Sequence, residues 1–461
     1  MTGPNYTGLV AAQRAYFLTG ATRAAAWREE QLRAVVSMIR ENREAMFDAL
    51  WQDLRRNRFD ADLMDVEYCA KEAQYALDHL HEWMKPERVH TPLVFEPGHV
   101  RVRRDPLGVC LIIGAWNEPY MLTLAPLVAA IAGGNTAVLK PSEISAACAQ
   151  VTAEMVPRHL DPQAFAVVQG AIPETTALLE QHWDFIFFTG SPKVGRIIHQ
   201  AAAKHLTPAV LELGGKNPTI VHASANVRSA ARRIAFSRYI NSGHICTAPD
   251  HVLVWPEVKD EFVAEMRDAI HDFYGEDPKQ SPDYGRVIDD KSFARIAGYL
   301  DNGTVAVGGQ TDPAERYIAP TVLVDVPADS PVMQEEVFGP VLPVLEIDSV
   351  QAVIDWVNTR PRPLGLYVFA EDDGVAEEIL DATESGDAAV NDCSIHPLVP
   401  ELPFGGVGNS GMGKYHGRFG FEAFTNARGV LYHGSRLDPG VKYPPYAEHE
   451  RMHGVISKLM P

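Results

Sequence analysis

The stretch 211–250 holds the residues whose types and spacing are best suited to chemistry. Glu212 stands beside the glycines Gly214 and Gly215, and Cys246 follows later in a small, polar turn. An ionised thiol attacks carbonyl carbon well, and a nearby carboxylate can activate water to release the acyl group that results. The pair therefore predicts covalent catalysis on a carbonyl substrate.

Each of these two residues also has an ordinary structural explanation. Cys246 follows a predicted helix, whereas Cys110 lies in an apolar strand and Cys69 and Cys148 fall in helical patterns. Partly exposed thiols ionise and buried ones are inert, but Cys246 could equally be a small residue in a turn. Glu212 follows an apolar run, so its carboxylate has either a raised pKa and a catalytic task or a structural partner.

These side chains need a scaffold, and the hydrophobic pattern predicts a doubly wound α/β sheet. The apolar run 108–114, bounded by glycines, is typical of a strand that is buried on both faces. Strands and helices then alternate, with strands expected at 136–140, 165–169 and 185–188 and helices at 146–156, 174–181 and 194–204. Ligands of such sheets bind beyond the carboxyl ends of the strands.

Several candidate residues directly follow these strands. Asn117 could donate its amide to a developing oxyanion, although asparagines in such loops commonly cap turns. Lys140 and Glu143 could bind a ribose diol, or they could simply begin a helix. Gly170 and Gly190 come after the next two strands, at the same predicted edge of the sheet.

The segment 188–195 is a strand-to-helix turn in which backbone N–H groups and the positive end of a helix could hold a pyrophosphate. A turn of this kind without any ligand is also common. The segment 406–411 matches G-x-G-x-x-G, but it follows no apolar strand and opens no periodic helix. We interpret 406–411 as a loop that needs unusual backbone angles.

Other parts of the chain surround this sheet. Amphipathic helices are expected from 9 to 84, and 98–105 alternates as an exposed strand or hairpin. A second α/β lobe is expected from about residue 210, without a flexible linker before it. Its expected helices are 229–239, 257–273, 291–300 and 350–358, its expected strands are 251–255 and others near Val305 and Val322, and 419–432 returns as a strand.

Composition excludes several classes of function. The formal net charge of −19, from 41 basic and 60 acidic residues, opposes binding to nucleic acid and to anionic membranes. The five cysteines are scattered and form no C-x-x-C pair, which favours reduced thiols in the cytoplasm and no metal site. No signal peptide and no run of roughly 18 apolar residues is present, so no membrane partner is expected.

Taken together, the motifs resemble the aldehyde dehydrogenase superfamily over nearly the whole chain, and they are most similar to its class 3, fatty and aromatic, branch. The blocks are GAWN at 114–117, KPSE at 140–143, FTGS at 188–191, LELGGKNP at 211–218, NSGHIC at 241–246, EEVFGP at 335–340 and the Gly-dense segment 403–417. The resemblance implies a Rossmann-like NAD(P)-binding domain, an α/β catalytic domain and a small β-hairpin oligomerisation arm.

The resemblance implies oxidation of an aldehyde to an acid through a thiohemiacetal and a thioester on Cys246. Asn117 would hold the oxyanion, and Glu212 would activate water, a role that Glu336 could share. The cofactor would be NAD, with NADP possible. The implied cofactor-binding residues are Trp116, Lys140, Glu143, Gly170, Phe188, Gly190, Ser191, Val194, Leu213, Gly214, Glu336 and Phe338.

The same resemblance implies a homodimer and a division of the chain. The expected NAD(P)-binding domain is 1–85 with 105–210, and the catalytic domain is 211–402. The oligomerisation segments are 86–104 and 403–435, and 436–461 is a tail. Two alternatives stay open: a dehydrogenase that passes the acyl group to coenzyme A, and a silent homologue that binds without turnover.

Two residues depart from the class 3 pattern. Glu118 stands where an aromatic residue is usual, and His244-Ile245 replaces a usual Gln-Thr pair. We expect Glu118 and His244 to form an ion pair at the entrance that favours polar or cationic aldehydes. The alternative is that Glu118 simply points into solvent.

Overall fold

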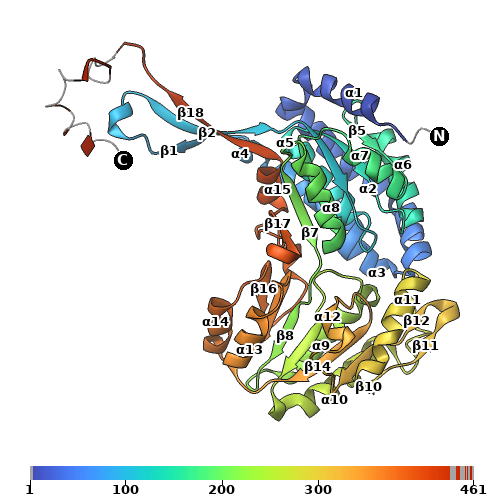
Figure 1. Ribbon diagram of the computed structural model, residues 1–461. Coiled ribbons are helices and arrows are strands. Elements are labelled where there is room, and N and C mark those ends of the chain that lie inside the picture. The colour runs from blue at the N-terminus through green and yellow to red at the C-terminus, as the bar shows by residue number, and fades with distance from the viewer. Residues whose placement is uncertain (1–3, 437–442, 447–451, 453, 455–456, 459–461) are drawn as a thin grey trace.

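The structure is a computed structural model that describes residues 4–436, 443–446, 452, 454 and 457–458. It has two α/β lobes and an arm of β-strands that projects from the first lobe (Figure 1). Each lobe is built on its own sheet, with six strands in the first and seven in the second. The arm is a separate three-stranded sheet.

The chain enters through the helices that its apolar spacing predicts. Their bounds are α1 Thr7–Leu18, α2 Ala25–Leu54, α3 Arg58–Ala61, a π-helical turn Asp62–Val66 and α4 Glu67–Trp83. Leu32, Val35 and Ile39 of α2 are all buried, which confirms an amphipathic helix. Arg55, with a φ of 56°, ends α2 in the left-handed conformation.

The first sheet has the strand order β17-β7-β6-β3-β4-β5 and is parallel except for β17. Its strands are β3 Val109–Ile113, β4 Thr136–Lys140, β5 Phe165–Val167, β6 Phe185–Gly190, β7 Ala209–Leu213 and β17 Gly411–Met412. Cys110 and Ile112 of β3 pack into one hydrophobic cluster, and Leu111 and Ile113 pack into another. Alternate residues thus face opposite helical layers, which confirms the predicted doubly wound sheet.

The helices of this lobe are α5 Met121–Gly133, α6 Ala146–His159, α7 Ile172–Leu179 and α8 Pro192–Ala203. The pattern predicted the last three but not α5. All residues of α5 are buried, so this helix carries no polar face and no helical period.

Strand β7 corrects the expected point at which the second lobe begins. Residues 209–213 pair with β6 on one side and, through Gly411 and Met412, with β17 on the other. Glu212 therefore belongs to the sheet of the first lobe, and the second sheet begins at Pro218. Apolar strands of the two lobes look alike in sequence, so the pattern could not assign β7 to a sheet.

The second sheet has the order β10-β13-β14-β9-β8-β15-β16. Its strands are β8 Pro218–Val221, β9 His251–Val254, β10 Thr304–Val307, β13 Thr321–Val324, β14 Val341–Glu346, β15 Gly365–Phe369 and β16 Asp387–Val390. Its helices are α9 Val227–Tyr239, α10 Pro256–Tyr274, α11 Asp290–Ala297, α12 Pro331–Gln334, α13 Val350–Asn358 and α14 Asp373–Ala382, and the short pair β11 Thr311–Asp312 and β12 Tyr317–Ile318 lies apart from the main sheet.

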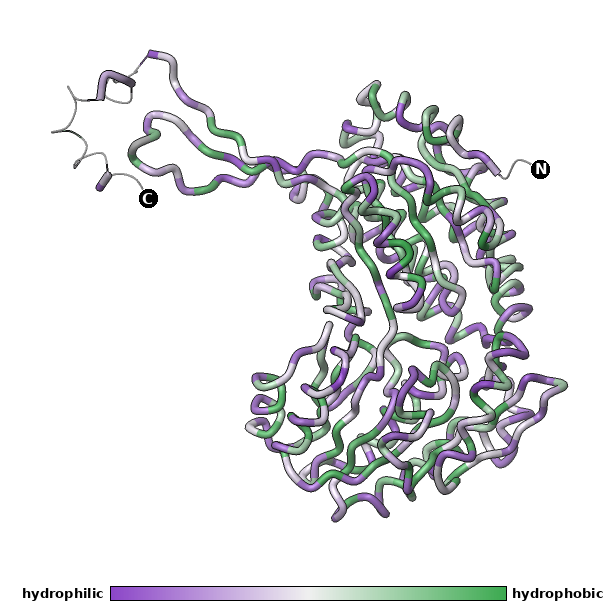
Figure 2. The backbone as a smooth tube through the Cα atoms, in the orientation of Figure 1, coloured by the Kyte–Doolittle hydropathy of each residue, from purple (hydrophilic) through white to green (hydrophobic). Residues whose placement is uncertain are grey.

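The projecting arm consists of β1 Glu87–Val89, β2 His99–Pro106 and β18 Thr425–Tyr432, and helix α15 Gly417–Ala423 precedes β18. It confirms the predicted exposed hairpin (Figure 1). The strand expected at 419–432 is confirmed only over β18, because the first part of that stretch belongs to α15. Hydrophilic and hydrophobic residues alternate along the arm (Figure 2). The predicted tail 436–461 lies largely outside the described residues.

All five cysteines are free thiols. Among the residues that the structure describes, no helix is both long and apolar enough to cross a membrane.

Candidate active site

A cavity of about 640 Å³ gathers nearly all of the predicted site residues. Gly170 is the exception: it is not a lining residue, and the side chain of Glu174 packs against it instead. The predicted residues that do line the cavity are Trp116, Asn117, Lys140, Glu143, Phe188, Gly190, Ser191, Val194, Glu212, Leu213, Gly214, Cys246, Glu336 and Phe338.

The buried side chain of Asn217 anchors the turn that carries Cys246. The side-chain amide of Asn217 donates hydrogen bonds to the carbonyl oxygens of Cys246, at 2.8 Å, and Ala248, at 3.0 Å. Its side-chain oxygen accepts from the N–H of Gly365 at 2.8 Å. One side chain thus fixes the Cys246 turn to strand β15.

The approach to Cys246 is a run of left-handed backbone. Asn241, Ser242 and Gly243 have φ values of 49°, 51° and 76°. L residues rarely adopt this conformation, so the surrounding contacts must hold it. One such contact is the hydrogen bond of 2.8 Å that the Asn241 amide donates to the carbonyl oxygen of Asn117.

Asn117 itself is buried, and its side-chain Nδ2 has no hydrogen-bond partner within the described part of the chain. A buried amide donor without a partner costs about 1–3 kcal/mol. Because Asn117 lines the same cavity as Cys246, this donor can serve a ligand oxygen there.

Glu212 lies buried near the end of β7, and neither carboxyl oxygen has a hydrogen-bond partner among the described residues. Gly405 leaves room for it, since a Cβ there would lie 2.7 Å from Glu212 Oε1. Burial, assisted by the charge of Asp387, raises the pKa of Glu212 well above its usual value, although Lys414 opposes this. A carboxyl with a raised pKa is suited to general acid–base work.

Glu336 enters the cavity from a well-braced loop. Arg295 donates hydrogen bonds to the carbonyl oxygens of Glu336, at 3.2 Å, and Val337, at 3.0 Å. Lys216 donates to the carbonyl of Glu335 at 2.9 Å. Burial raises the pKa of Glu336 to about 8. The Glu336 carboxyl packs against Gly214, and a side chain at that position would leave no room for this carboxyl.

The surroundings of Cys246 disfavour its thiolate in the free protein. Burial is the main cause that raises its pKa well above the usual value, and the charges of Glu118, Glu336 and Glu212 add to it. Attack on a carbonyl therefore requires a base that removes the thiol proton at the moment of reaction.

The other end of the cavity fits a dinucleotide. Ile172 and Val194 line it although they are 77% and 40% exposed, and a flat base would cover this apolar surface. Lys140 Nζ donates to Glu143 Oε2 at 2.7 Å, which places a donor and an acceptor for a ribose diol side by side. Ser191 caps α8 through the N–H of Val194.

The expected ion pair between Glu118 and His244 is wrong. Burial lowers the pKa of His244 to about 3, so its ring is uncharged, and the ring packs edge-on against Trp116 at 5.0 Å. Glu118 is only 4% exposed and faces Arg56 at 3.8 Å, which also excludes the solvent-facing alternative. Neither burial nor the distant Arg56 is visible in the local sequence.

The pattern missed several lining residues. Arg295, Leu364, Phe404 and Tyr415 also line the cavity. Phe404 and Tyr415 form a β-bridge within the Gly-dense segment, on either side of the predicted loop 406–411. Nothing in the spacing of Arg295 or Leu364 marked them.

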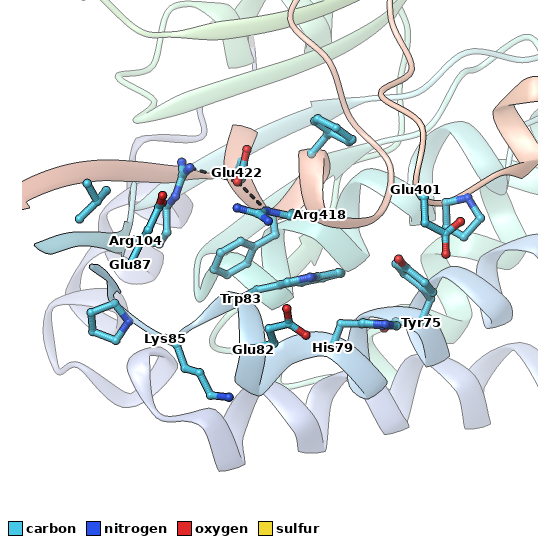
Figure 3. A pocket seen from close by; sticks show the side chains of 15 residues that line it. Tyr75, His79, Glu82, Trp83, Lys85, Glu87, Arg104, Glu401, Arg418 and Glu422 are labelled. Carbon is cyan, nitrogen blue, oxygen red and sulfur yellow. Dashed lines mark hydrogen bonds and ion pairs between the residues drawn. The ribbon is translucent and has the colours of Figure 1, made fainter. Parts of the chain in front are cut away.

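A second cavity, of about 560 Å³, lies at the base of the arm between α4 and α15 (Figure 3). The rings of Tyr75, His79 and Trp83 pack in a row along one wall (Figure 3). On the opposite wall, Glu422 pairs with Arg104 and Arg418 (Figure 3). It contains none of the predicted site residues.

Comparisons with known proteins agree with this geometry. The family profile described as Aldehyde dehydrogenase family matches residues 6–430. Aldehyde dehydrogenase family 3 member B2 of Mus musculus is 45% identical over 96% of this chain and 93% of the relative. The Mus musculus protein named "Aldehyde dehydrogenase, dimeric NADP-preferring" is 44% identical over 96% of this chain and 98% of its own length. The solved structure named "Substrate bound state of Staphylococcus Aureus AldH" matches with a TM-score of 0.95 and 38% identity, covering 97% of this chain and 98% of that one.

Proposed function

The chain belongs to the aldehyde dehydrogenase family, and we propose that Cys246 is the nucleophile of its reaction. The protein is an NAD(P)-dependent oxidoreductase that converts an aldehyde to a carboxylic acid. The observation that carries the residue assignment is that Cys246, the unpartnered amide of Asn117 and the unpartnered carboxyl of Glu212 line one cavity.

In the first step the sulfur of Cys246 bonds to the aldehyde carbon, and the thiol proton passes to one of the carboxylates that share the cavity, Glu212 or Glu336. Asn117 Nδ2 and the backbone N–H of Cys246 donate to the oxygen of the resulting thiohemiacetal. Such donors are most effective in a buried site, because they need no reorganisation when charge develops. When bound, the dinucleotide accepts the hydride that leaves this adduct.

The thioester on Cys246 then needs water. Glu212 takes a proton from that water, whose oxygen attacks the acyl carbon and breaks the carbon–sulfur bond. Support comes from burial, which raises the pKa of Glu212 and so makes it a stronger base than an exposed carboxylate, and from its oxygens, which have no partner among the described residues. Transfer to coenzyme A would need no such base, which disfavours that alternative.

For the cofactor we assign the adenine to the apolar surface of Ile172 and Val194, the adenosine ribose to Lys140 and Glu143, and the pyrophosphate to the turn around Gly190 and Ser191. Glu336 and Phe338 lie beside the nicotinamide end in this assignment. The ion pair of Lys140 with Glu143 and the exposed apolar residues support it.

We also propose a homodimer formed through the arm. A relative that is 44% identical carries the word "dimeric" in its name. Exposed apolar residues on the arm, among them Leu93 and Leu431, offer a contact surface. A cytoplasmic location stays a prediction that rests on the cysteine usage.

Two variants test the assignment. We expect Cys246→Ser to reduce NADH formation from an aldehyde by at least about a thousandfold, because a hydroxyl is a far weaker nucleophile. In Glu212→Gln we expect the thioester to accumulate, and mass spectrometry should show an acyl group on the Cys246 peptide. Oxidation at the original rate in Cys246→Ser would refute the proposal. Turnover at the wild-type rate in Glu212→Gln would indicate that Glu336 is the base.

A further inference from the structure

A buried network of charges includes Glu118, the residue that follows Asn117. The guanidinium of Arg56 faces three carboxyl groups: Asp60 at 2.8 Å, Asp65 at 3.5 Å and Glu118 at 3.8 Å. All four side chains are buried. Because one cation faces three acids, ionisation of the acids leaves the network with surplus negative charge.

The network does not satisfy its own polar atoms. Glu118 Oε1, Asp65 Oδ2 and the Nε and Nη1 atoms of Arg56 have no hydrogen-bond partner among the described residues. Buried polar atoms are rarely left in this state without a functional reason or a bound molecule. Replacement of such a network by apolar residues is often neutral or stabilising, so stability alone does not explain it.

The network adjoins the cavity without lining it, since none of its four side chains is among the lining residues. Glu118 is adjacent to Asn117, and its carbonyl oxygen accepts from the N–H of Leu122 at 2.9 Å; both neighbours line the cavity. After burial, the charge of Glu118 is the largest cause of the raised pKa of Cys246. It raises the pKa of Tyr415, another lining residue, as well. The charge of Glu118 therefore acts where an aldehyde must sit.

We propose that Glu118, held by Arg56, is a specificity-determining residue that selects aldehydes carrying a positive charge, such as an ammonium group, over neutral aldehydes of the same shape. The inference rests on the proposed function, since it takes Cys246 as the position of the carbonyl. A buried carboxylate within several ångströms of a cation attracts it far more strongly than the same pair in water.

The ionisation of the network favours this selection. Burial raises the pKa of Glu118 to about 8 and that of Asp65 to about 7. Groups with such values release a proton readily when a cation approaches, because the cation stabilises the carboxylate form. A neutral aldehyde offers no such compensation, so it gains nothing from the charge of the carboxylate.

The test compares trimethylammoniobutanal with the neutral aldehyde in which a carbon atom replaces the quaternary nitrogen. Assays at about pH 8.5 lie above the pKa of Glu118, so its carboxylate form predominates. We expect wild-type enzyme to show a higher kcat/KM for the cation, and Glu118→Gln to lower the ratio of the two kcat/KM values about tenfold. Glu422→Gln is the control, because Glu422 lies at the second cavity and is not among the charges that act on Cys246 or Tyr415.

A second measurement needs no variant. Cys246 in the wild-type enzyme is alkylated with bromoethyl-trimethylammonium and with its carbon isostere, and each rate is divided by the rate for free cysteine. We expect the cationic reagent to be the faster one by about tenfold after this correction. Equal corrected alkylation rates in the wild type would overturn the inference while leaving the proposed function intact. So would a ratio of the two kcat/KM values that Glu118→Gln leaves unchanged. Absence of NADH from both aldehydes would count against the proposed function instead.

Discussion

Burial, together with the nearby carboxyls of Glu118, Glu336 and Glu212, determines how the thiol of Cys246 responds to pH. Since its pKa is raised, the thiolate is the minor form at pH 7 and grows as the pH rises. We therefore expect iodoacetamide to alkylate Cys246 of the cofactor-free enzyme at pH 7 at least about tenfold more slowly than free cysteine. Mass spectrometry of the Cys246 peptide measures this rate, and alkylation as fast as that of the free thiol would contradict it.

Glu143 gives a prediction about the cofactor. Its carboxylate, paired with Lys140, would repel a phosphate on the adenosine ribose, whereas a neutral side chain would not. We expect Glu143→Gln to raise the ratio of kcat/KM for NADP to that for NAD by about tenfold, with aldehyde KM unchanged. A similar substitution at the exposed Glu154 is the control. An unchanged ratio would show that Glu143 turns away from the ribose.

At the level of single residues, the sequence predicted which side chains gather but not how they are charged. Fourteen of the predicted residues line the cavity because motif positions lie at the carboxyl ends of strands. The partners of Glu118 and His244 were not predictable, since burial and contacts between distant segments decide them. Gly170 illustrates the same limit, because its neighbour Glu174 fills the space beside it.

At the level of elements, the positions of most strands and helices followed from hydrophobic period. Strand β4 and helix α13 match their expected bounds. Helix α5 was missed because it is apolar on all sides. Strands β8, β14, β15 and β16 were missed because periodicity alone cannot distinguish a short apolar run from part of a buried helix. Sheet membership of β7 depends on backbone pairing with β17, which no local pattern encodes.

The Cys246 turn gives a prediction at this scale. Asn217→Ala would leave the carbonyls of Cys246 and Ala248 and the N–H of Gly365 without their partner. We expect the free energy of unfolding to fall by about 2–4 kcal/mol and kcat to fall at least about tenfold, because the nucleophile loses its position.

Calorimetry and NADH formation measure the two effects. Asn358→Ala is the control, since that asparagine bonds a single carbonyl at the exposed end of α13. If the two variants had the same Tm and kcat, Asn217 would have no special part in holding the turn.

At the scale of the whole molecule, the arm gives a prediction about assembly. Leu93 and Leu431 lie on the arm and are 66% and 48% exposed, which is unfavourable unless a partner covers them. We expect the double variant Leu93→Asp with Leu431→Asp to halve the mass measured by light scattering. The control is Leu206→Asp, since Leu206 lies on the body of the protein and is 91% exposed. We expect this variant to have the same mass as the wild type. If the double variant kept the wild-type mass, the interface could not depend on these arm residues.

The first sheet is closed by β17, and the arm by β18, both of which come from the end of the chain. The ribosome therefore releases every strand of the second lobe before it has made the last strand of the first. The second lobe can complete its sheet during synthesis, whereas the first must wait with β7 open along one edge. During translation, the strand that carries Glu212 is thus exposed to premature pairing with other nascent chains.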